Sequence, residues 1–523
     1  MTRRRTAILL LCATLAAADR WEWAKAARWG EDQAVPLRLA ESLPRHPPSV
    51  GILNSRGDPN PNGLVWLAWS LSALSSFRMM AFAVALAQVG ALVALATSIL
   101  PSGARWPALL ALLSSAPLRF ATELWSQWLV VTLSAVALAS LLAYRRSPQP
   151  YWFGGSIAAA LCCGALYLPG VVTLLAFTAL WISLLATRRP ARWWPLLAIA
   201  GALAFVAMAA TFGPYLSAVD IFALQPATPR GVFKRMVLSA YEALAGPIGA
   251  IRVAAGPPWM TTVATPGRDF AGLGMTIALA GAALWVQVGL TTAMYVRAVV
   301  RGRDGGYPLG GLAWAGAFVV MACLLTPLIT GQAPSRDGRD DLLAQFLPVM
   351  LVLVFGSPLL LDDHTLIARA AARLSMGTVV VFAIASALAG HRLSTELAAP
   401  ASSVIMRPGQ PGFAMEEAVA AVARDWADRG GAPIPIEYAI DRGVFAQTGE
   451  WVARPSVWHA RTLKAGEGFD LALERTMGRR NACGPRCPEG TGRYVVTLPD
   501  EPMPEGSRDV WHGSGLRVWW VEG

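Results

Sequence analysis

Long apolar runs recur along most of this chain, and they decide what it can fold into. The runs that carry almost no charge are Phe82–Leu100, Trp128–Ala143, Val171–Ala186, Trp194–Thr211, Phe270–Val288, Leu312–Leu328, Leu342–Leu361 and Thr378–Ala389. With its flanks, each is near or above the roughly 17–25 residues that a helix needs to cross a bilayer. Helices satisfy their own backbone hydrogen bonds, so such runs form helices in lipid. The sequence therefore predicts a mainly α, polytopic transmembrane bundle.

We expect about eleven spans by window length. They cover roughly 6–21, 77–100, 106–122, 126–144, 151–168, 170–187, 193–213, 270–294, 309–329, 341–361 and 374–391. Composition agrees with this, because the 523 residues are 55% hydrophobic and 15% charged, whereas a soluble protein carries about a quarter charged residues. The first span has a short apolar core that ends in three alanines, Ala16 to Ala18, and therefore also resembles a signal peptide with its cleavage site.

The net charge of +11 would raise nucleic acid as a partner of a soluble protein. Here the arginines cluster between apolar runs and act as topology signals instead, so no nucleic acid is expected.

With a cytoplasmic N-terminus, every inner turn carries arginine: Arg3, Arg4 and Arg5; Arg105; Arg145 and Arg146; Arg188, Arg189 and Arg192; Arg297, Arg301 and Arg303; Arg369 and Arg373. An odd number of spans then places the tail outside, as expected for a multi-pass protein of a bacterial cytoplasmic (inner) membrane.

Residues 1–394 are predicted to form the transmembrane domain, and 395–523 a small extracytoplasmic α/β domain. The tail is richer in charge, Pro and Gly. It shows helical spacing over 415–429 and strand-like runs over 434–440, 493–498 and 516–521.

Cys483 and Cys487 lie close together in this tail. A disulfide is favoured in an oxidising compartment, and a metal pair is the alternative, although no second Cys or His pair stands nearby.

Two long segments, 20–76 and 213–269, are expected outside with the tail, and long loops in compact proteins are usually functional. The first contains Glu31 and Asp32, which are candidates for a base or a metal site. The simpler interpretation, favoured on composition alone, is that they cap the following helix.

The expected outer turn 117–127 carries Arg119 and Glu123. Both are functional candidates because they lie near membrane depth. The alternative is that the two simply pair with each other.

A third set is cationic and is expected on the outer side: Arg230, Lys234, Arg235, Arg252, Arg336 and Arg339. Arginines outside run against the positive-inside trend, and guanidinium groups suit phosphate oxygens. The alternative is a solvated loop in which Asp337, Asp340 and Asp341 neutralise the neighbouring arginines.

Taken in order, these segments resemble the GT-C superfamily of membrane glycosyltransferases, especially the branch related to protein O-mannosyltransferases and aminoarabinose transferases (glycosyltransferase family 39). The family's acidic pair corresponds to Glu31-Asp32, its Gly…Ser stretch to Gly51…Ser55, and its Pro-rich helix entry to Asn60-Pro61-Asn62-Gly63-Leu64. Further matches are Ala116–Gln127, Tyr167–Gly170, Gly213–Leu216, and Arg339 with Pro348. Departures are the inverted order of the acidic pair, Asn62 for a second Pro, and Gln345-Phe346 before Pro348. The resemblance covers roughly residues 1–395.

The resemblance implies transfer of a sugar from a polyprenyl-phosphate donor to a lipid, glycan or protein acceptor on the extracytoplasmic face. It makes Asp32 the first choice of base and Glu31 the second, with Glu123 as a further catalytic candidate. Asp58 and Asn60 are candidates for positioning the acceptor or the loop. Arg336, Arg339, Arg230 and Lys234 are the available groups for the lipid phosphate. A divalent cation is optional, with Glu31, Asp32 and Asp58 as oxygen ligands.

Two other readings stay open. One is a non-catalytic, GT-C-like scaffold of an envelope polysaccharide complex, for which the departures in the acidic pair leave room. The other is a transporter of lipid-linked sugars, which would need ionisable residues or broken helices at the midplane.

Overall fold

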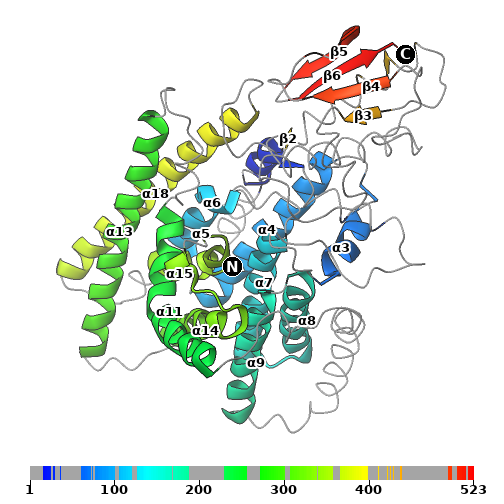
Figure 1. Ribbon diagram of the computed structural model, residues 1–523. Coiled ribbons are helices and arrows are strands. Elements are labelled where there is room, and N and C mark those ends of the chain that lie inside the picture. Colours follow the sequence, from blue (N-terminus) through cyan, green and yellow to red (C-terminus); the bar gives the residue numbers. More distant parts are fainter. Residues whose placement is uncertain are drawn as a thin grey trace.

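The computed structural model describes most of the apolar part of the chain and some of the tail. The described residues are 14, 16–24, 28–29, 36, 40, 61–71, 73–74, 77–100, 105–119, 126–167, 169–187, 229–255, 271–300, 307–337, 340–356, 366–398, 410–411, 421, 424–425, 428, 436–438, 493–497, 503, 505–513 and 516–522. The fold is mostly helical, as predicted (Figure 1).

The described helices follow one another along the chain with short connections or gaps between them. Those of the first half are α3 (Gly63–Leu71), α4 (Phe77–Ile99), α5 (Arg105–Ser114), α6 (Ala116–Arg119), α7 (Ser126–Arg146), α8 (Pro150–Leu166) and α9 (Gly170–Thr187). Those of the second half are α11 (Pro229–Ala255), α13 (Ala271–Val300), α14 (Tyr307–Thr330), α15 (Pro334–Asp337), α16 (Asp340–Leu343), the 3-10 turn η3 (Ala344–Phe346), α17 (Leu347–Gly356) and α18 (Leu366–Ala398).

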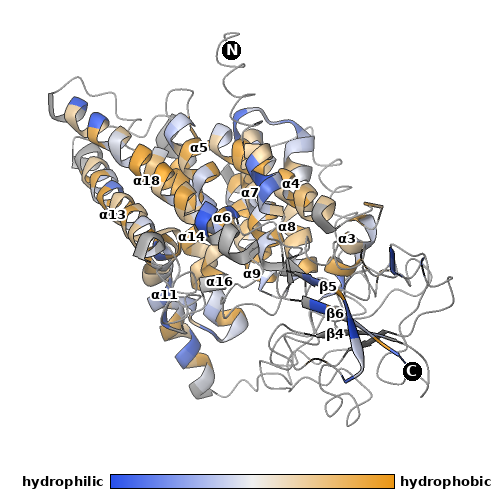
Figure 2. Cartoon of the chain, turned by 90° about the horizontal axis from the view of Figure 1, so that it is seen from above, coloured by the Kyte–Doolittle hydropathy of each residue, from blue (hydrophilic) through white to orange (hydrophobic). Residues whose placement is uncertain are grey.

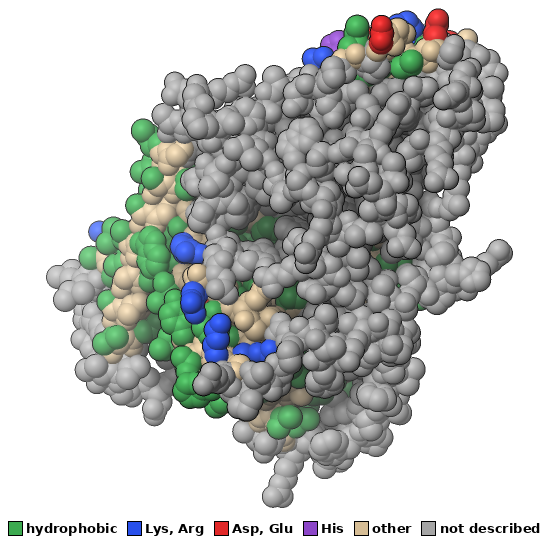
Figure 3. Space-filling view, viewed as in Figure 1, with side chains coloured by type: hydrophobic (Ala, Val, Ile, Leu, Met, Phe, Trp, Pro, Cys, Tyr) green, Lys and Arg blue, Asp and Glu red, His purple; other side chains and the backbone are tan. Residues whose placement is uncertain are grey.

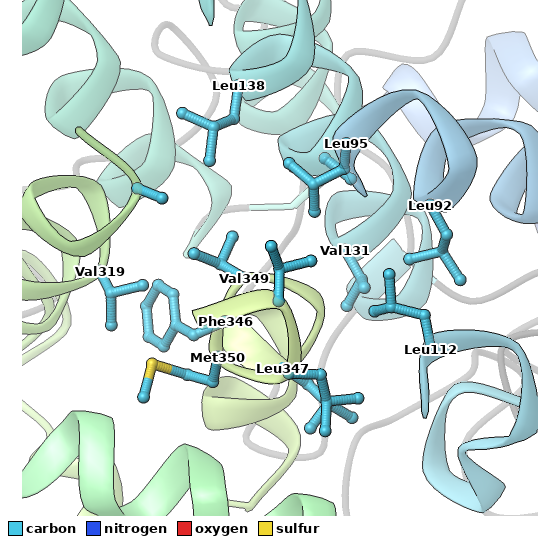
Figure 4. Close-up of a cluster of buried hydrophobic side chains, with 14 of the residues drawn as sticks. Leu92, Leu95, Leu112, Val131, Leu138, Val319, Phe346, Leu347, Val349 and Met350 are labelled. Carbon is cyan, nitrogen blue, oxygen red and sulfur yellow. The ribbon is translucent and has the colours of Figure 1, made fainter. Parts of the chain in front are cut away.

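The short helix α17 lies at the centre of the bundle. It contacts α4, α5, α7, α11, α13 and α14, and all its residues except Leu353 are buried. Figure 4 shows Phe346, Leu347, Val349 and Met350 of η3 and α17 surrounded by side chains of the neighbouring helices, which include Leu92, Leu95, Leu112, Val131, Leu138 and Val319. An apolar helix that is hydrophobic all round belongs inside a bundle rather than at its surface.

Six described helices are long and apolar enough to cross a membrane: Met79–Ile99, Trp128–Arg146, Gly231–Ala255, Gly274–Val296, Gly311–Thr330 and Arg369–Arg392. Figure 2 shows apolar residues along their lengths. The chain is therefore a multi-pass membrane protein. Shorter apolar helices cover Pro150–Leu166, Gly170–Leu185 and Ala344–Gly356. The expected span 193–213 and most of 6–21 lie outside the described residues, so the count of eleven stays a prediction.

Three expected elements differ from the prediction. The span expected over 106–122 is divided into α5 and α6, and the one over 341–361 is divided into α16, η3 and α17. The loop expected over 213–269 contains the 27-residue helix α11. This helix carries five charged residues, among them Glu242 and Arg252. An apolar window therefore missed it, although it is amphipathic.

Arginines hold one end of the bundle together. Arg105 donates from Nε to the carbonyl oxygen of Leu100 (2.8 Å) and from Nη2 to that of Thr97 (3.1 Å). Arg146 donates to the carbonyl oxygens of Thr97 and Ser98, and Arg145 stacks over the Trp314 ring. Cations suit the free carbonyls at a helix C-terminus. The structure thus brings together Arg105, Arg145 and Arg146, which were predicted to share the inner side of the membrane.

The tail contributes a four-stranded sheet made of β3 (Ile436–Tyr438), β4 (Arg493–Thr497), β5 (Ser507–Gly513) and β6 (Leu516–Val521) in the order β3-β4-β6-β5. Only β3 and β4 pair in parallel. Strands were predicted at the positions of β3, β4 and β6. The polar strand β5, which carries a bulge between Asp509 and Trp511, was not. The domain boundary at 395 stays a prediction.

A two-residue ladder joins residues 28–29 to residues 410–411 of the tail. Strand β1 (Arg28–Trp29) pairs antiparallel with β2 (Gln410–Pro411). These two segments were predicted to lie together in the extracytoplasmic compartment, and that placement stays a prediction.

Close backbone contact between α8 and α9 requires a glycine at position 170. A Cβ atom there would collide with the carbonyl oxygen of Cys163, whereas a Cβ at Gly154 of α8 would meet nothing. We expect Gly170→Ala to lower the free energy of unfolding by about 1–3 kcal/mol, because overpacking forces the backbone to shift. Gly154→Ala should leave it unchanged or raise it by up to about 1 kcal/mol. Thermal unfolding of the detergent-solubilised protein measures both, and equal Tm values for the two variants would contradict the packing described here.

Candidate functional site

A buried cluster of charged side chains joins three separate parts of the chain. Helical residues 16–23 supply Asp19, Arg20 and Trp23, α6 supplies Arg119, and α18 supplies a backbone carbonyl. Nη2 of Arg119 lies 3.2 Å from Oδ1 of Asp19, and its Nη1 donates to the carbonyl oxygen of Ala387 (3.2 Å). The Arg119 guanidinium also lies over the Trp23 ring, 5.7 Å from its centre, in a cation–π arrangement.

A glycine of α18 makes room for this cluster. A Cβ atom at Gly390 would lie 3.0 Å from Nη1 of Arg119 and 3.1 Å from the Trp23 ring. Ser386, one turn earlier, accepts a hydrogen bond from the backbone N–H of Ala116 (2.8 Å). These contacts fix α6 against α18.

The cluster lies at the opposite end of α4 from Arg105 and Arg146. The Trp21 ring contacts the ring of Phe82 edge-on, with centroids 5.1 Å apart, and Phe82 lies near the start of the span Met79–Ile99. Gly390 likewise lies near the end of the span Arg369–Arg392. The cluster is therefore at the rim of the apolar bundle, where charged groups cost less than at its centre.

The charges in the cluster do not balance. Arg20 donates from Nη1 to Oδ2 of Asp19 (3.1 Å), so one carboxylate serves two guanidinium groups. Arg20 is 0% exposed and Arg119 is 7% exposed. Nε and Nη2 of Arg20 and Nε of Arg119 have no hydrogen-bond partner in the part of the chain that the structure describes. Charges removed from water without a partner are costly, so this site favours an anion.

A second set of polar contacts links α11 to α15. Glu242 is fully buried, and its Oε1 accepts hydrogen bonds from the backbone N–H (2.9 Å) and the hydroxyl (2.7 Å) of Ser335. Gly249 faces the same serine, because a Cβ there would lie 2.9 Å from its Oγ. The buried carboxylate thus fixes the start of the short helix that carries Arg336.

Exposed cations gather on α11 and α15. Lys234, Arg252 and Arg336 are exposed, and Arg235 donates from Nη1 to the carbonyl oxygen of Leu328 (3.4 Å). Figure 3 shows a row of Lys and Arg side chains on this face of the described surface. Helix α11 also contacts α6 and α16, so these cations and Arg119 come from elements that pack together.

The structure describes only part of the predicted site. Lys234 and Arg336 lie on elements that contact each other, and Arg230 belongs to α11, although its side chain is not among those described. Glu31, Asp32, Asp58, Asn60, Glu123, Arg339, Cys483 and Cys487 lie outside the described residues. Within the described ranges no group of three His, Cys, Asp or Glu could hold a metal ion, and the proposed carboxylate ligands of a cation lie outside those ranges.

Sequence reasoning missed Asp19, Arg20 and Glu242. Asp19 and Arg20 stand where the first apolar run ends, which is an ordinary place for charges, and Glu242 lies in a segment predicted to be a loop. Arg119 was noted as a possible partner of Glu123. The structure gives it Asp19, a residue distant in the sequence that no local pattern could pair with it.

No protein-family model matches the chain, and no curated protein matches it. Among solved structures, ArnT from Cupriavidus metallidurans bound to undecaprenyl phosphate is 15% identical, covers 98% of both chains and has a TM-score of 0.43.

Two mycobacterial structures are also similar. The arabinosyltransferase EmbB from Mycobacterium smegmatis is 13% identical over 83% of this chain and 44% of its own, with a TM-score of 0.43. The arabinofuranosyltransferase AftD from Mycobacteria is 14% identical over 100% of this chain and 40% of its own, with a TM-score of 0.37. The chain thus spans less than half the length of these two proteins.

The hydrogen bonds between Glu242 and Ser335 can be tested by a double-mutant cycle. Glu242→Gln should lower the free energy of unfolding by about 1.5–3 kcal/mol, since bonds to a charged group are lost. Combined with Ser335→Ala, the two changes should show a coupling of roughly 0.5–3 kcal/mol. Lys234→Gln, on the exposed face of the same helix, should add to Ser335→Ala without coupling. Additive effects of Glu242→Gln and Ser335→Ala would show that the contact contributes nothing.

Proposed function

We propose that this chain is a membrane glycosyltransferase that transfers a sugar from a polyprenyl-phosphate-linked donor to an acceptor on the extracytoplasmic face. The observation that carries the proposal is the ion pair between Asp19 and Arg119, 3.2 Å apart. Asp19 precedes the segment with Glu31 and Asp32, and Arg119 shortly precedes Glu123. The pair thus joins two residues that precede, in the sequence, the segments with the predicted catalytic carboxylates.

The arrangement of α11 supports a phosphate-binding role for the predicted cations. This helix packs against α6, which carries Arg119, and against α15, which carries Arg336. The same helix also carries Arg230 and Lys234. Positive groups near a departing phosphate stabilise the charge that develops on it. A leaving lipid phosphate in this region would face several cations from two adjoining helices.

The reaction would proceed by direct displacement at the anomeric carbon of the donor sugar. Asp32, or Glu31 as the second choice, takes the proton from the acceptor hydroxyl or amine. The acceptor atom then forms its bond to the anomeric carbon, while the bond from that carbon to the phosphate oxygen breaks. The electron pair leaves on the polyprenyl phosphate, which the cations of α11 and α15 hold. General base catalysis of this kind contributes roughly 10²–10⁴-fold to the rate.

A transporter of lipid-linked sugars is the second candidate, and Glu242 is the observation that favours it. A buried carboxylate in a helix apolar enough to cross the membrane is a functional candidate by default. Its Oε1 is nevertheless occupied by two hydrogen bonds from Ser335. Glu242 therefore has a structural task, which makes the enzyme the better supported function.

The test is transfer of radiolabelled sugar from polyprenyl-phosphate sugar in proteoliposomes that contain the full-length protein. We expect transfer by the wild type and a roughly 10²–10⁴-fold loss in the double variant Glu31→Gln with Asp32→Asn. Glu505→Gln, which removes an exposed carboxylate in the tail, is the matched control and should retain full activity.

Three outcomes would contradict the proposal. Full activity in the double variant rules out these carboxylates as the base. Movement of labelled lipid across the bilayer without transfer indicates the transporter. The absence of both activities, with donors and acceptors varied, indicates the scaffold.

A further inference from the structure

The buried guanidinium group of Arg20 presents one complete edge that no described residue satisfies. Its Nη1 binds Asp19, whereas Nε and Nη2 have no partner. These two nitrogen atoms lie on the same edge of the group, and their N–H bonds run parallel. A parallel pair of this kind binds two oxygens of one carboxylate or phosphate at once.

The neighbouring arginine adds charge and a further donor. Asp19 binds Arg119 through Oδ1 and Arg20 through Oδ2, so the two guanidinium groups flank one carboxylate. Nε of Arg119 is also without a partner among the described residues. Two positive charges and one negative charge leave a surplus of one positive charge. A bound group with a single negative charge would neutralise it.

The depth of the cluster in the bundle indicates which anion is available. The cluster lies near the start of the span Met79–Ile99, through Trp21 and Phe82, and near the end of the span Arg369–Arg392, through Ala387 and Gly390. Span ends meet the headgroup layer of a bilayer, where phosphate groups are the main anions. A phosphodiester carries one negative charge, which matches the surplus.

We infer that Arg20 and Arg119 form a binding site for one phosphate group, which is supplied by a phospholipid headgroup or by free phosphate. Arg20 binds two of its oxygens through Nε and Nη2, and Arg119 contributes charge and its Nε. The inference does not depend on the proposed transferase activity, because the site is defined by unsatisfied donors and not by the predicted catalytic carboxylates.

The site can be tested with full-length protein freed of phospholipid in an uncharged detergent. The probes are inorganic phosphate, acetate, dioctanoyl phosphatidylglycerol and uncharged dioctanoylglycerol, and the readout is the rise in Tm with probe concentration, from which a Kd follows. We expect the Tm to rise with at least one phosphate-bearing probe. A response to the lipid alone identifies a headgroup as the source, and a response to inorganic phosphate shows that free phosphate enters.

Variants separate binding from a merely structural role. Arg20→Gln should raise the Kd roughly tenfold to a hundredfold, because the bidentate bonds to a charged group are lost. Asp19→Asn should lower the Kd, because it removes the competing negative charge. Arg373→Gln, an exposed arginine of α18, should leave the Kd unchanged.

The inference fails on any of four results. These are no rise in Tm with either phosphate probe, equal binding by the wild type and Arg20→Gln, an equal response to dioctanoylglycerol, or stabilisation by acetate but not by phosphate. If Arg20→Gln does not fold, the comparison of Asp19→Asn with the wild type decides: tighter binding supports the site, and unchanged or weaker binding overturns it.

Discussion

Charged groups and free backbone carbonyls inside an apolar bundle must find their partners within the protein, and this requirement organises both ends of the structure. At one end, Arg105 and Arg146 donate to the last carbonyls of α4. At the other, Arg119 joins the carboxylate of Asp19 to a backbone carbonyl of α18. Interactions of this kind gain strength where water is scarce. They tie helices that are far apart in the sequence into one body.

The central helix α17 connects this framework to the proposed site. It follows directly on α15, α16 and η3, and its apolar side chains are enclosed by the surrounding helices (Figure 4). Packing of small and apolar side chains is what holds helices together in lipid. The segment that carries Arg336 is therefore anchored on one side by Glu242, through Ser335, and on the other by the bundle core. A cation held in this way can be placed accurately although it lies on a short helix.

Much of the helical fold could be predicted from the sequence, because α4, α7, α13, α14 and α18 are long apolar runs with few charges. Helix α11 escaped the same reasoning, since Arg230, Lys234, Arg235, Glu242 and Arg252 make it amphipathic. The division of the expected span 106–122 into α5 and α6 also depends on tertiary packing. Of the site, the sequence indicated Lys234 and Arg336 as members of a larger set of cations on one side. The ion pair between Asp19 and Arg119 could be identified only in the structure, because no local sequence pattern relates the two residues.

The ladder between β1 and β2 has a consequence for how the tail should be regarded. Trp29 lies just before Glu31, and its strand pairs with Gln410 and Pro411, beyond the end of α18. Residues 28 and 29 are thus held by backbone bonds to a stretch that a hydropathy plot assigns to a different domain. Truncation after α18 would deprive that segment of its strand partner. The polypeptide is therefore better divided by these hydrogen bonds than by its change in composition.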